Sequence, residues 1–316
     1  KGLQNLSRQA RNLSTGYSVG TADPDEPPQD SGTLGTTIAP DQLVTTIAFG
    51  HSLFGARYGL AASKPDGLKP MPRFPDDDLD DTRTHGDVLV TLAATQRDTV
   101  VHAMRELLRE TRDTFAVRWT LDGFSSADRG PTPRAARRNL FGFRDGTSNP
   151  PADARVWRPD GGTFQVVRTI RMQVEFWDRV GMREQETMIG RTRDTGAPLG
   201  GSDEFQSPRF DLDPEGDRIA LDAHIRLANP RTPATEAQRF VRRSFNYHRG
   251  VDRAGQLDQG LIFVAYNADI ERQFEAVQKR LAGEPLTDYI TPVGGGYFFA
   301  PRGSRGPTDW VGSSLL

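Results

Sequence analysis

The sequence contains no cysteine among its 316 residues. This absence excludes disulfides, thiolate metal ligands, a cysteine nucleophile and any thioether link to a cofactor. A metal site in this chain must therefore use histidine, aspartate, glutamate or a bound cofactor.

Long apolar runs and a strong net charge are also missing. No apolar run approaches the roughly twenty residues that a membrane-spanning helix needs, and the N-terminus lacks the apolar core of a signal peptide. The formal net charge of −2 and the isoelectric point near 6.3 leave no basic face for nucleic acid. Lysine is scarce, with 4 lysines against 36 arginines, which we treat mainly as compositional bias. We expect a soluble chain with no membrane span and no nucleic-acid partner.

The polar and apolar patterns indicate an N-terminal arm followed by two halves. Residues 1–38 are rich in Gly, Pro, Asp, Ser and Thr without sustained periodicity, which predicts an extended arm that adds little to the core. Residues 39–155 and 156–316 each contain a strand-helix-strand pattern. This duplication predicts an α+β fold of two ferredoxin-like halves with antiparallel sheets and peripheral helices, as in the dimeric α/β-barrel superfamily.

The predicted elements follow from apolar spacing. Strands are predicted at 43–49, 88–92, 115–121, 164–170, 261–266 and 297–299, and helices at 100–108, 174–180 and 269–281. Long loops are predicted at 64–81 and 190–210, where Pro, Gly and Asp gather.

One short segment, Leu140 to Pro150, places Asp145 between Gly142 and Gly146. Glycine permits backbone angles and close approaches that a Cβ would block, so a flat ligand could lie against this segment. The Asp-Gly and Asn-Pro pairs are also common in surface turns, which is the alternative interpretation. We interpret Asp145 as a buried catalytic acid, because the chain later supplies a possible metal ligand and a cationic partner.

The possible metal ligands are the five histidines at positions 51, 85, 102, 224 and 248. His102 lies in a predicted amphipathic helix, where a solvated or helix-packing role is favoured over ligation. His224 lies in a predicted strand, Ile219 to Leu227, on the polar face that also carries Asp222 and Arg226. Metal ligation by His224 competes with an ordinary polar strand face, and His248 is the second candidate ligand.

Three motifs together resemble those of the dye-decolourising peroxidases: Gly142-Phe143-Arg144-Asp145-Gly146, His224-Ile225-Arg226-Leu227-Ala228-Asn229-Pro230 and Val241-Arg242-Arg243-Ser244. Their order and spacing match, and segments 191–199, 260–263 and 294–299 extend the resemblance from about residue 40 to the C-terminus. The long form is most similar to the secreted bacterial branch of that family.

The resemblance implies a non-covalent haem b with His224 as the proximal iron ligand. It also implies that Asp288 accepts the second N–H of that imidazole, which makes the ring more electron-donating. A solvated turn residue is the alternative for Asp288. Arg226, Phe263 and Leu261 are further candidate cofactor contacts, and core packing explains Phe263 and Leu261 equally well.

The resemblance implies that Asp145 and Arg242 lie above the distal face of the haem. Asp145 would take a proton from bound hydrogen peroxide and return it to the outer oxygen, while the charge of Arg242 stabilises the departing oxygen. Adjacent strand residues face opposite sides, so only one of Arg242 and Arg243 can point at the iron, and the resemblance favours Arg242. Ser244 stands where another branch of the family has a distal asparagine, so that amide has no counterpart here.

The implied function is that of a haem peroxidase that reduces hydrogen peroxide and oxidises bulky aromatic donors, such as dyes and phenols, through a ferryl intermediate. Such donors exceed a peroxide-sized pocket, so electrons are expected to leave through Trp157, Trp310 or Tyr247, whereas Trp177 is expected to pack beside Phe176. A homo-oligomer is compatible with the sequence.

Two alternatives stay open. The first is a haem- or iron-handling, deferrochelatase-like protein on the same fold, and the second is a chlorite dismutase, a family that lacks the distal aspartate. The resemblance implies twin-arginine export to the periplasm or the exterior, and the polar N-terminus is equally compatible with a cytoplasmic protein.

Overall fold

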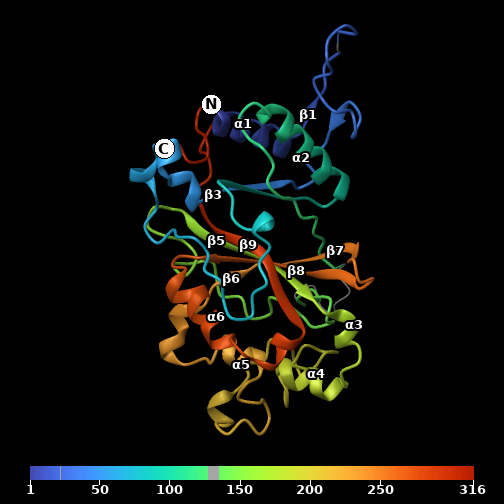
Figure 1. Cartoon of the computed structure of the whole chain (residues 1–316), viewed down its shortest axis with the longest axis vertical. Coiled ribbons are helices and arrows are strands. Elements are labelled where there is room, and N and C mark those ends of the chain that lie inside the picture. The colour runs from blue at the N-terminus through green and yellow to red at the C-terminus, as the bar shows by residue number, and fades with distance from the viewer. Residues whose placement is uncertain (22, 127–134) are drawn as a thin grey trace. The chain divides into compact units, whose positions relative to one another are not determined.

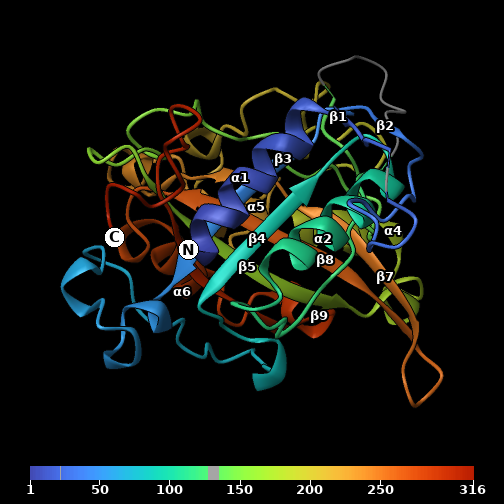
Figure 2. The same ribbon diagram turned by 90° about the horizontal axis from the view of Figure 1, so that it is seen from above.

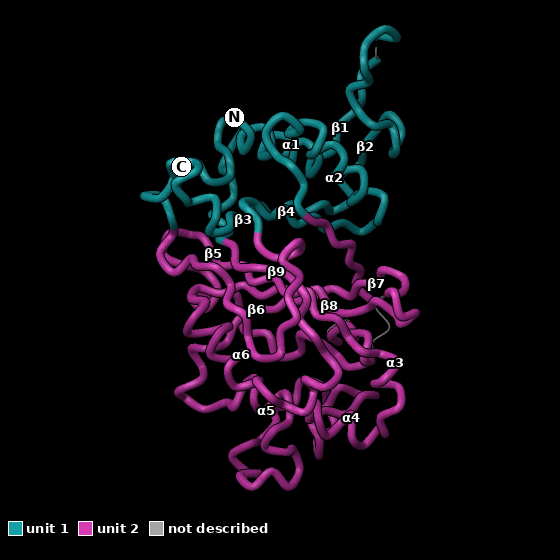
Figure 3. The backbone as a smooth tube through the Cα atoms, viewed as in Figure 1, with its two compact units in different colours: residues 1–64, 86–118, 299–316 teal, residues 65–85, 119–298 magenta. Residues whose placement is uncertain are grey.

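The computed structural model describes residues 1–21, 23–126 and 135–316. The chain forms two compact units: unit 1 comprises residues 1–64, 86–118 and 299–316, and unit 2 comprises residues 65–85 and 119–298 (Figure 3). Each unit combines segments that are distant in the sequence. The units therefore differ from the contiguous halves 39–155 and 156–316 that the sequence pattern suggested.

Unit 1 contains a strand pair and two helices. Strand β3 (Val44–Gly50) pairs antiparallel with β4 (Val88–Ala93), with Ile47 opposite Val90. Helix α1 (Gly2–Thr15) and helix α2 (Arg97–Thr111) lie side by side over this pair (Figures 1 and 2). Short strands β1 (Tyr17–Ser18) and β2 (Thr37–Ile38) also pair antiparallel.

Helix α1 corrects the prediction of an extended arm over residues 1–38. Leu6, Ala10 and Leu13 recur at helical spacing and are buried, so one face of α1 belongs to the core of unit 1. The helix was not predicted because most residues of the segment are polar. A surface helix needs only a narrow apolar stripe on one face.

Two other predictions for unit 1 and its border need correction. Residues 115–121 form no strand, and the side chain of Val117 is 54% exposed, because the alternating segment meets no partner strand. Helix α2 has the predicted position but a different buried face: His102 and Glu106 are buried, whereas Val101 is 42% exposed. His102 and Glu106 face inward because each has a polar partner there: Asp30 for His102 and Arg109 for Glu106.

Unit 2 is built on an antiparallel sheet with the order β9-β5-β8-β6, and β7 also pairs with β8. The strands are β5 (Thr163–Met172), β6 (Val241–Arg242), β7 (Phe245–Val251), β8 (Leu257–Asn267) and β9 (Ile290–Ala300). The first seven residues of β5 are buried, and they include the polar side chains of Gln165 and Arg168. The α+β class with antiparallel sheets is confirmed.

The helices of unit 2 are short. They are α3 (Val174–Trp177), α4 (Met182–Ile189), α5 (His224–Ala228), a π-helix (Glu271–Glu275) that runs into α6 (Ala276–Leu281), and a 3-10 helix (Pro285–Asp288). Helices α5 and α6 lie side by side (Figure 1). Trp177 is buried and stacks on Phe141 with ring centroids 4.3 Å apart, which confirms its predicted packing role. No helix among the described residues is both long and apolar enough to cross a membrane.

Candidate active site

His224 is the first residue of helix α5, and not part of a strand as its alternating surroundings suggested. The preceding residue, Ala223, is extended and buried, whereas Leu221 is 56% exposed, so the apolar alternation does not correspond to a buried face. Pro230 cannot continue the helix, which ends at Ala228. The imidazole of His224 therefore projects from the N-terminal end of a short helix.

A buried carboxylate orients the imidazole of His224. The Nδ1–H group donates to Glu284, with Nδ1 at 3.0 Å from Oε1 and 2.9 Å from Oε2. The Glu284 side chain is 2% exposed and that of His224 is 24% exposed. Burial lowers the pKa of His224, but the charge and the hydrogen bond of Glu284 outweigh it, so the pKa lies above the ordinary histidine value. With Nδ1 engaged by Glu284, Nε2 is the nitrogen that can bind a metal.

Glu284 replaces Asp288 as the partner of His224. Asp288 is the last residue of the 3-10 helix Pro285–Asp288 and is exposed, whereas Glu284 immediately precedes the proline that begins this helix. The prediction therefore chose the wrong carboxylate of the same turn. Glu284 is the N-cap residue of this helix and is buried.

Asp145 and Arg242 form an ion pair, with Nη1 of Arg242 at 3.2 Å from Oδ1 of Asp145. Their side chains are 17% and 27% exposed, so both keep access to a ligand or solvent. The charges of both residues also act on the pKa of His224: Arg242 lowers it and Asp145 raises it. The structure thus pairs two of the residues that the motifs singled out.

Arg242, and not Arg243, faces Asp145. The backbone of Arg242 is held by the side chain of Asn149, whose Oδ1 accepts from the Arg242 N–H at 3.0 Å and whose Nδ2 donates to the Arg242 carbonyl at 2.8 Å. Arg243 is exposed, and its N–H donates to the carbonyl of Val264. Sequence analysis missed Asn149, although it belongs to the same motif as Asp145.

The two glycines of the Asp145 segment adopt left-handed backbone angles, with φ of 85° at Gly142 and 96° at Gly146. A Cβ at Gly142 would lie 2.4 Å from Nε of Arg193, so the close approach at this glycine is to an arginine of the same unit. Arg144 forms a buried ion pair with Glu204 at 3.2 Å. These contacts fix the segment that carries Asp145.

Arginines gather beside this segment. Arg231 donates to the Oγ of Ser148 at 3.2 Å, and Arg239 donates to the Ser148 carbonyl at 3.3 Å. Arg191 is buried, and burial together with the charge of Arg231 lowers its pKa to about 10. With Arg242, these side chains give the site a concentration of positive charge.

Comparison with known proteins identifies the family. The family model described as Dyp-type peroxidase, N-terminal matches residues 1–125, and the one described as Dyp-type peroxidase, C-terminal matches residues 136–305. The chain belongs to the Dyp-type peroxidase family. This Dyp-type peroxidase is therefore an enzyme, a haem-dependent peroxidase with hydrogen peroxide as oxidant.

Individual relatives carry two kinds of name. The deferrochelatase of Escherichia coli (strain K12) is 47% identical over 318 residues, which cover 95% of this chain and 75% of the relative. The DyP-type peroxidase from Cellulomonas bogoriensis is 35% identical, with a TM-score of 0.87 over 99% of this chain and 87% of that one. Ferric DtpA from Streptomyces lividans is 34% identical, with a TM-score of 0.88 over 99% and 86% of the two chains.

The residues of this Dyp-type peroxidase fit a haem on three observations. His224 has a nitrogen available beyond its Glu284 bond, and the arginine cluster suits the carboxylates of an anionic macrocycle. The buried hydroxyl oxygen of Ser244, two residues beyond Arg242, has no hydrogen-bond partner among the described residues. A polar ligand bound beside Arg242 would supply that partner.

Strand register puts two apolar candidates on the face of the sheet that also carries Arg242. Arg242 pairs with Ala265 on β8, and Phe263 and Leu261 lie on the same face of β8 as Ala265 because side chains alternate along a strand. Phe263 also packs against Phe274, with ring centroids 5.9 Å apart. Leu261 and Phe263 are half-buried, so a contact with the cofactor and a packing role are both compatible with their positions.

Arg226 holds the loop 213–219. Its guanidinium donates to Oδ2 of Asp213 at 3.2 Å and to the carbonyl of Ile219 at 2.8 Å, and it lies over the ring of Phe210. A contact between Arg226 and the cofactor stays a prediction.

The other candidates differ in exposure. His248 is exposed and hydrogen-bonds to Gln259. Trp157 is 50% exposed, and Trp310 is half-buried. Tyr247 is fully buried, which corrects its selection as a surface site.

Proposed function

We propose that this Dyp-type peroxidase holds haem b without a covalent link, reduces hydrogen peroxide and oxidises bulky aromatic donors. The ion pair of Asp145 and Arg242 beside the His224–Glu284 pair is the observation that carries this proposal. Together these two pairs supply a carboxylate, a permanent cation and an oriented imidazole. The absence of cysteine supports the non-covalent attachment.

The residues divide the work of peroxide reduction. His224 would hold the haem, whose iron would supply the electrons for the reduction of hydrogen peroxide. Asp145 would accept a proton from one peroxide oxygen and return it to the other, which would leave as water. Arg242 would stabilise the negative charge that develops on that leaving oxygen. Glu284 holds the His224 ring and makes Nε2 more electron-donating.

Aromatic donors are proposed to react at the protein surface when they exceed the size of the pocket. Trp157 offers a half-exposed indole, and indoles can hold an electron hole during transfer. Trp310 is the second site that this proposal retains. Hydrogen peroxide and organic donors are the small-molecule partners.

A second candidate function follows from the relatives named deferrochelatase, which are 47% identical to this chain. That name denotes removal of iron from a chelate. In this alternative the same His224 and Glu284 would hold haem as cargo, and peroxide reduction would be incidental.

One experiment separates the two functions. The haem-loaded protein is incubated with peroxide and an anthraquinone dye, and in parallel without peroxide under reducing conditions. The peroxidase proposal predicts peroxide-dependent bleaching of the dye while haem stays intact. Release of iron with appearance of metal-free porphyrin fluorescence, without dye bleaching, would instead establish the second function.

Export is also a proposal. Resemblance to the secreted branch leads us to propose a periplasmic or extracellular protein exported in folded form. Pulse labelling in the native host should reveal a longer precursor that disappears from the cytoplasm with time. A single form retained in the cytoplasm would contradict export.

A further inference from the structure

A buried cluster in unit 1 takes no part in the proposed peroxidase chemistry. Asp30 follows the short strand β1 along the chain, and His102 and Glu106 lie one turn apart on helix α2. The side chains are nearly inaccessible, at 2% exposure for Asp30, 1% for His102 and 1% for Glu106. One ligand atom from each of the three residues lies within 4.8 Å of the others.

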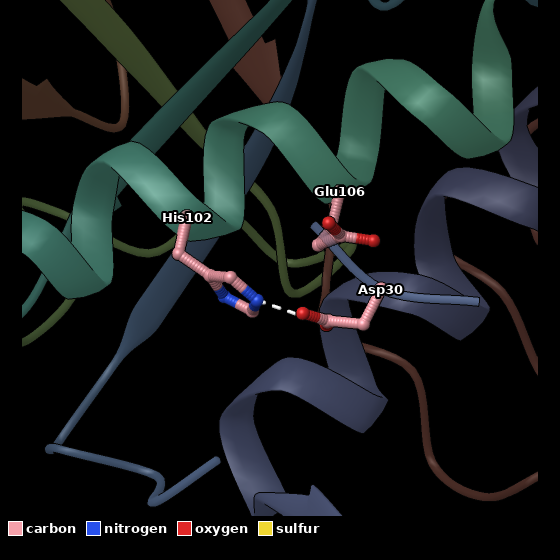
Figure 4. Close-up of side chains that lie close together, drawn as sticks. All are labelled: Asp30, His102 and Glu106. Carbon is pink, nitrogen blue, oxygen red and sulfur yellow. Dashed lines mark hydrogen bonds and ion pairs between the residues drawn. The ribbon is translucent and has the colours of Figure 1, made fainter. Parts of the chain in front are cut away.

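Figure 4 shows how the side chains meet. The imidazole of His102 faces the carboxylate of Asp30, with Nε2 at 2.9 Å from Oδ2, and Glu106 projects beside them from the same side of α2. Residues four apart on a helix share a face, so His102 and Glu106 form a paired nitrogen and oxygen donor set. The loop carrying Asp30 supplies a third donor from a separate segment.

Two carboxylates are buried in this cluster. Arg109 approaches one of them, with its Nε at 3.5 Å from Oε2 of Glu106. A divalent cation bound between Asp30 and Glu106 would interact with both carboxylates in a water-excluded place, where charges interact strongly.

The ligand atoms are only partly committed to other partners. Asp30 accepts hydrogen bonds from Tyr17 and from the Gly32 N–H, and Glu106 accepts one from the Ser31 N–H. The buried Nδ1 of His102 has no hydrogen-bond partner among the described residues. The Nε2–H of His102 donates to Oδ2 of Asp30, so a metal bound at Nε2 would displace that proton and replace this hydrogen bond.

We propose that Asp30, His102 and Glu106 bind one divalent transition-metal ion of the zinc class. One imidazole and two carboxylates suit such an ion, whereas Ca²⁺ and Mg²⁺ require about six or more oxygen ligands, many of them water, which this buried cluster does not offer. The ion would join the loop at Asp30 to helix α2. This site is structural and independent of the proposed haem chemistry.

Zinc retention by the haem-loaded protein tests the proposal. The protein is stripped with EDTA, equilibrated with Zn²⁺ and dialysed, after which zinc and haem are counted per chain. We expect one zinc ion per chain in the wild type and none in Glu106→Gln or His102→Gln. Glu110→Gln serves as the matched control, because Glu110 lies one turn further along α2 and pairs with the partly exposed Arg8.

A supporting variant and a spectroscopic measurement complete the test. Tyr17→Phe removes a hydrogen bond to Asp30 and should weaken zinc binding about 10–100-fold. Absorption at the zinc edge should show one nitrogen among oxygen ligands. The proposal fails if the wild type retains no zinc, if Glu106→Gln retains it equally, or if the edge spectrum shows oxygens alone. Should the variants not fold, judged by circular dichroism, the wild-type count and ligand set decide alone.

Discussion

At the scale of single residues, the imidazole of His224 is the group to which the proposed cofactor is attached. Replacing His224 by Ala should abolish stoichiometric haem binding, because it removes the imidazole whose Nε2 is left available by the bond from Nδ1 to Glu284. His248→Ala should retain full haem content, since His248 is exposed and contacts Gln259. Haem content is measured by pyridine haemochrome absorbance. An unchanged spectrum in the His224 variant would assign ligation to another residue.

The carboxylate behind the imidazole gives a second prediction. Glu284→Gln keeps the side-chain shape but removes the negative charge 2.9 Å from Nδ1 of His224. The less electron-rich ring should raise the reduction potential of the iron and lower peroxidase activity about 10–100-fold. A potentiometric titration measures the first effect. Asp288→Asn is the matched control, because Asp288 is exposed, and an equal change in both variants would refute the role of Glu284.

Residue identities in the site were partly predictable. Asp145 and Arg242 were singled out from contiguous motifs, and the structure shows that they form an ion pair, while their part in peroxide chemistry stays a proposal. Glu284 and Asn149 were missed, because their contacts with His224 and Arg242 join segments about 60 and 90 residues apart. No local pattern in the sequence reports such contacts.

At the scale of elements, the loop 213–219 is bound to helix α5 through Arg226. Asp213 accepts hydrogen bonds from the N–H groups of Ile219 and Arg218, and it pairs with Arg226 of α5. Hydrogen bonding from Ile219 outweighs the opposing effect of burial and holds the pKa of Asp213 below the ordinary aspartate value. The loop is therefore tied to α5 through a charged aspartate.

This shift predicts a pH dependence of stability. A carboxyl group with a lower pKa in the folded state contributes stability above its unfolded-state pKa, and this contribution is lost as the pH falls through the folded-state value. Asp213→Asn should therefore be less stable than the wild type at pH 7 and equally stable at strongly acidic pH. Urea unfolding at both pH values measures this. The exposed Asp217→Asn is the control, and a constant difference across pH would contradict the assignment.

Helices and strands were predicted correctly where the spacing of apolar residues in the sequence matches the residues that are buried in the structure. Strand β5 and strand β8 were found because both are long and largely apolar. Helix α5 was taken for a strand because residues 219–227 alternate, although Leu221 faces solvent. Helix α1 was missed because its three core residues are diluted by polar neighbours.

At the scale of the whole molecule, the proposed oxidation of large donors involves electron transfer through the protein. Trp157→Phe should lower turnover of a bulky dye, because it removes an exposed redox-active indole, and should leave the peroxide-induced spectral change of the haem at the wild-type rate. Trp310→Phe tests the second site, and Tyr247→Phe tests a buried one. Wild-type dye oxidation in all three variants and in their combination would show that donors reach the haem edge directly.

The α+β class was recovered from the sequence, and the arrangement of the units was not. Local periodicity reports strands and helices, but it cannot show that residues 86–118 and 299–316 join residues 1–64 in one unit. That assembly depends on packing between segments about 200 residues apart.

The distal ion pair is the centre of the proposed function, and one kinetic measurement tests it most directly. The haem-loaded Asp145→Asn and Arg242→Leu variants are mixed with hydrogen peroxide in a stopped-flow spectrometer, with Arg243→Leu as the exposed control. We predict that both distal variants retain haem but react about 10²–10⁴ times more slowly than the wild type, whereas the control is unchanged. Wild-type rates in both distal variants at full haem occupancy would contradict the account.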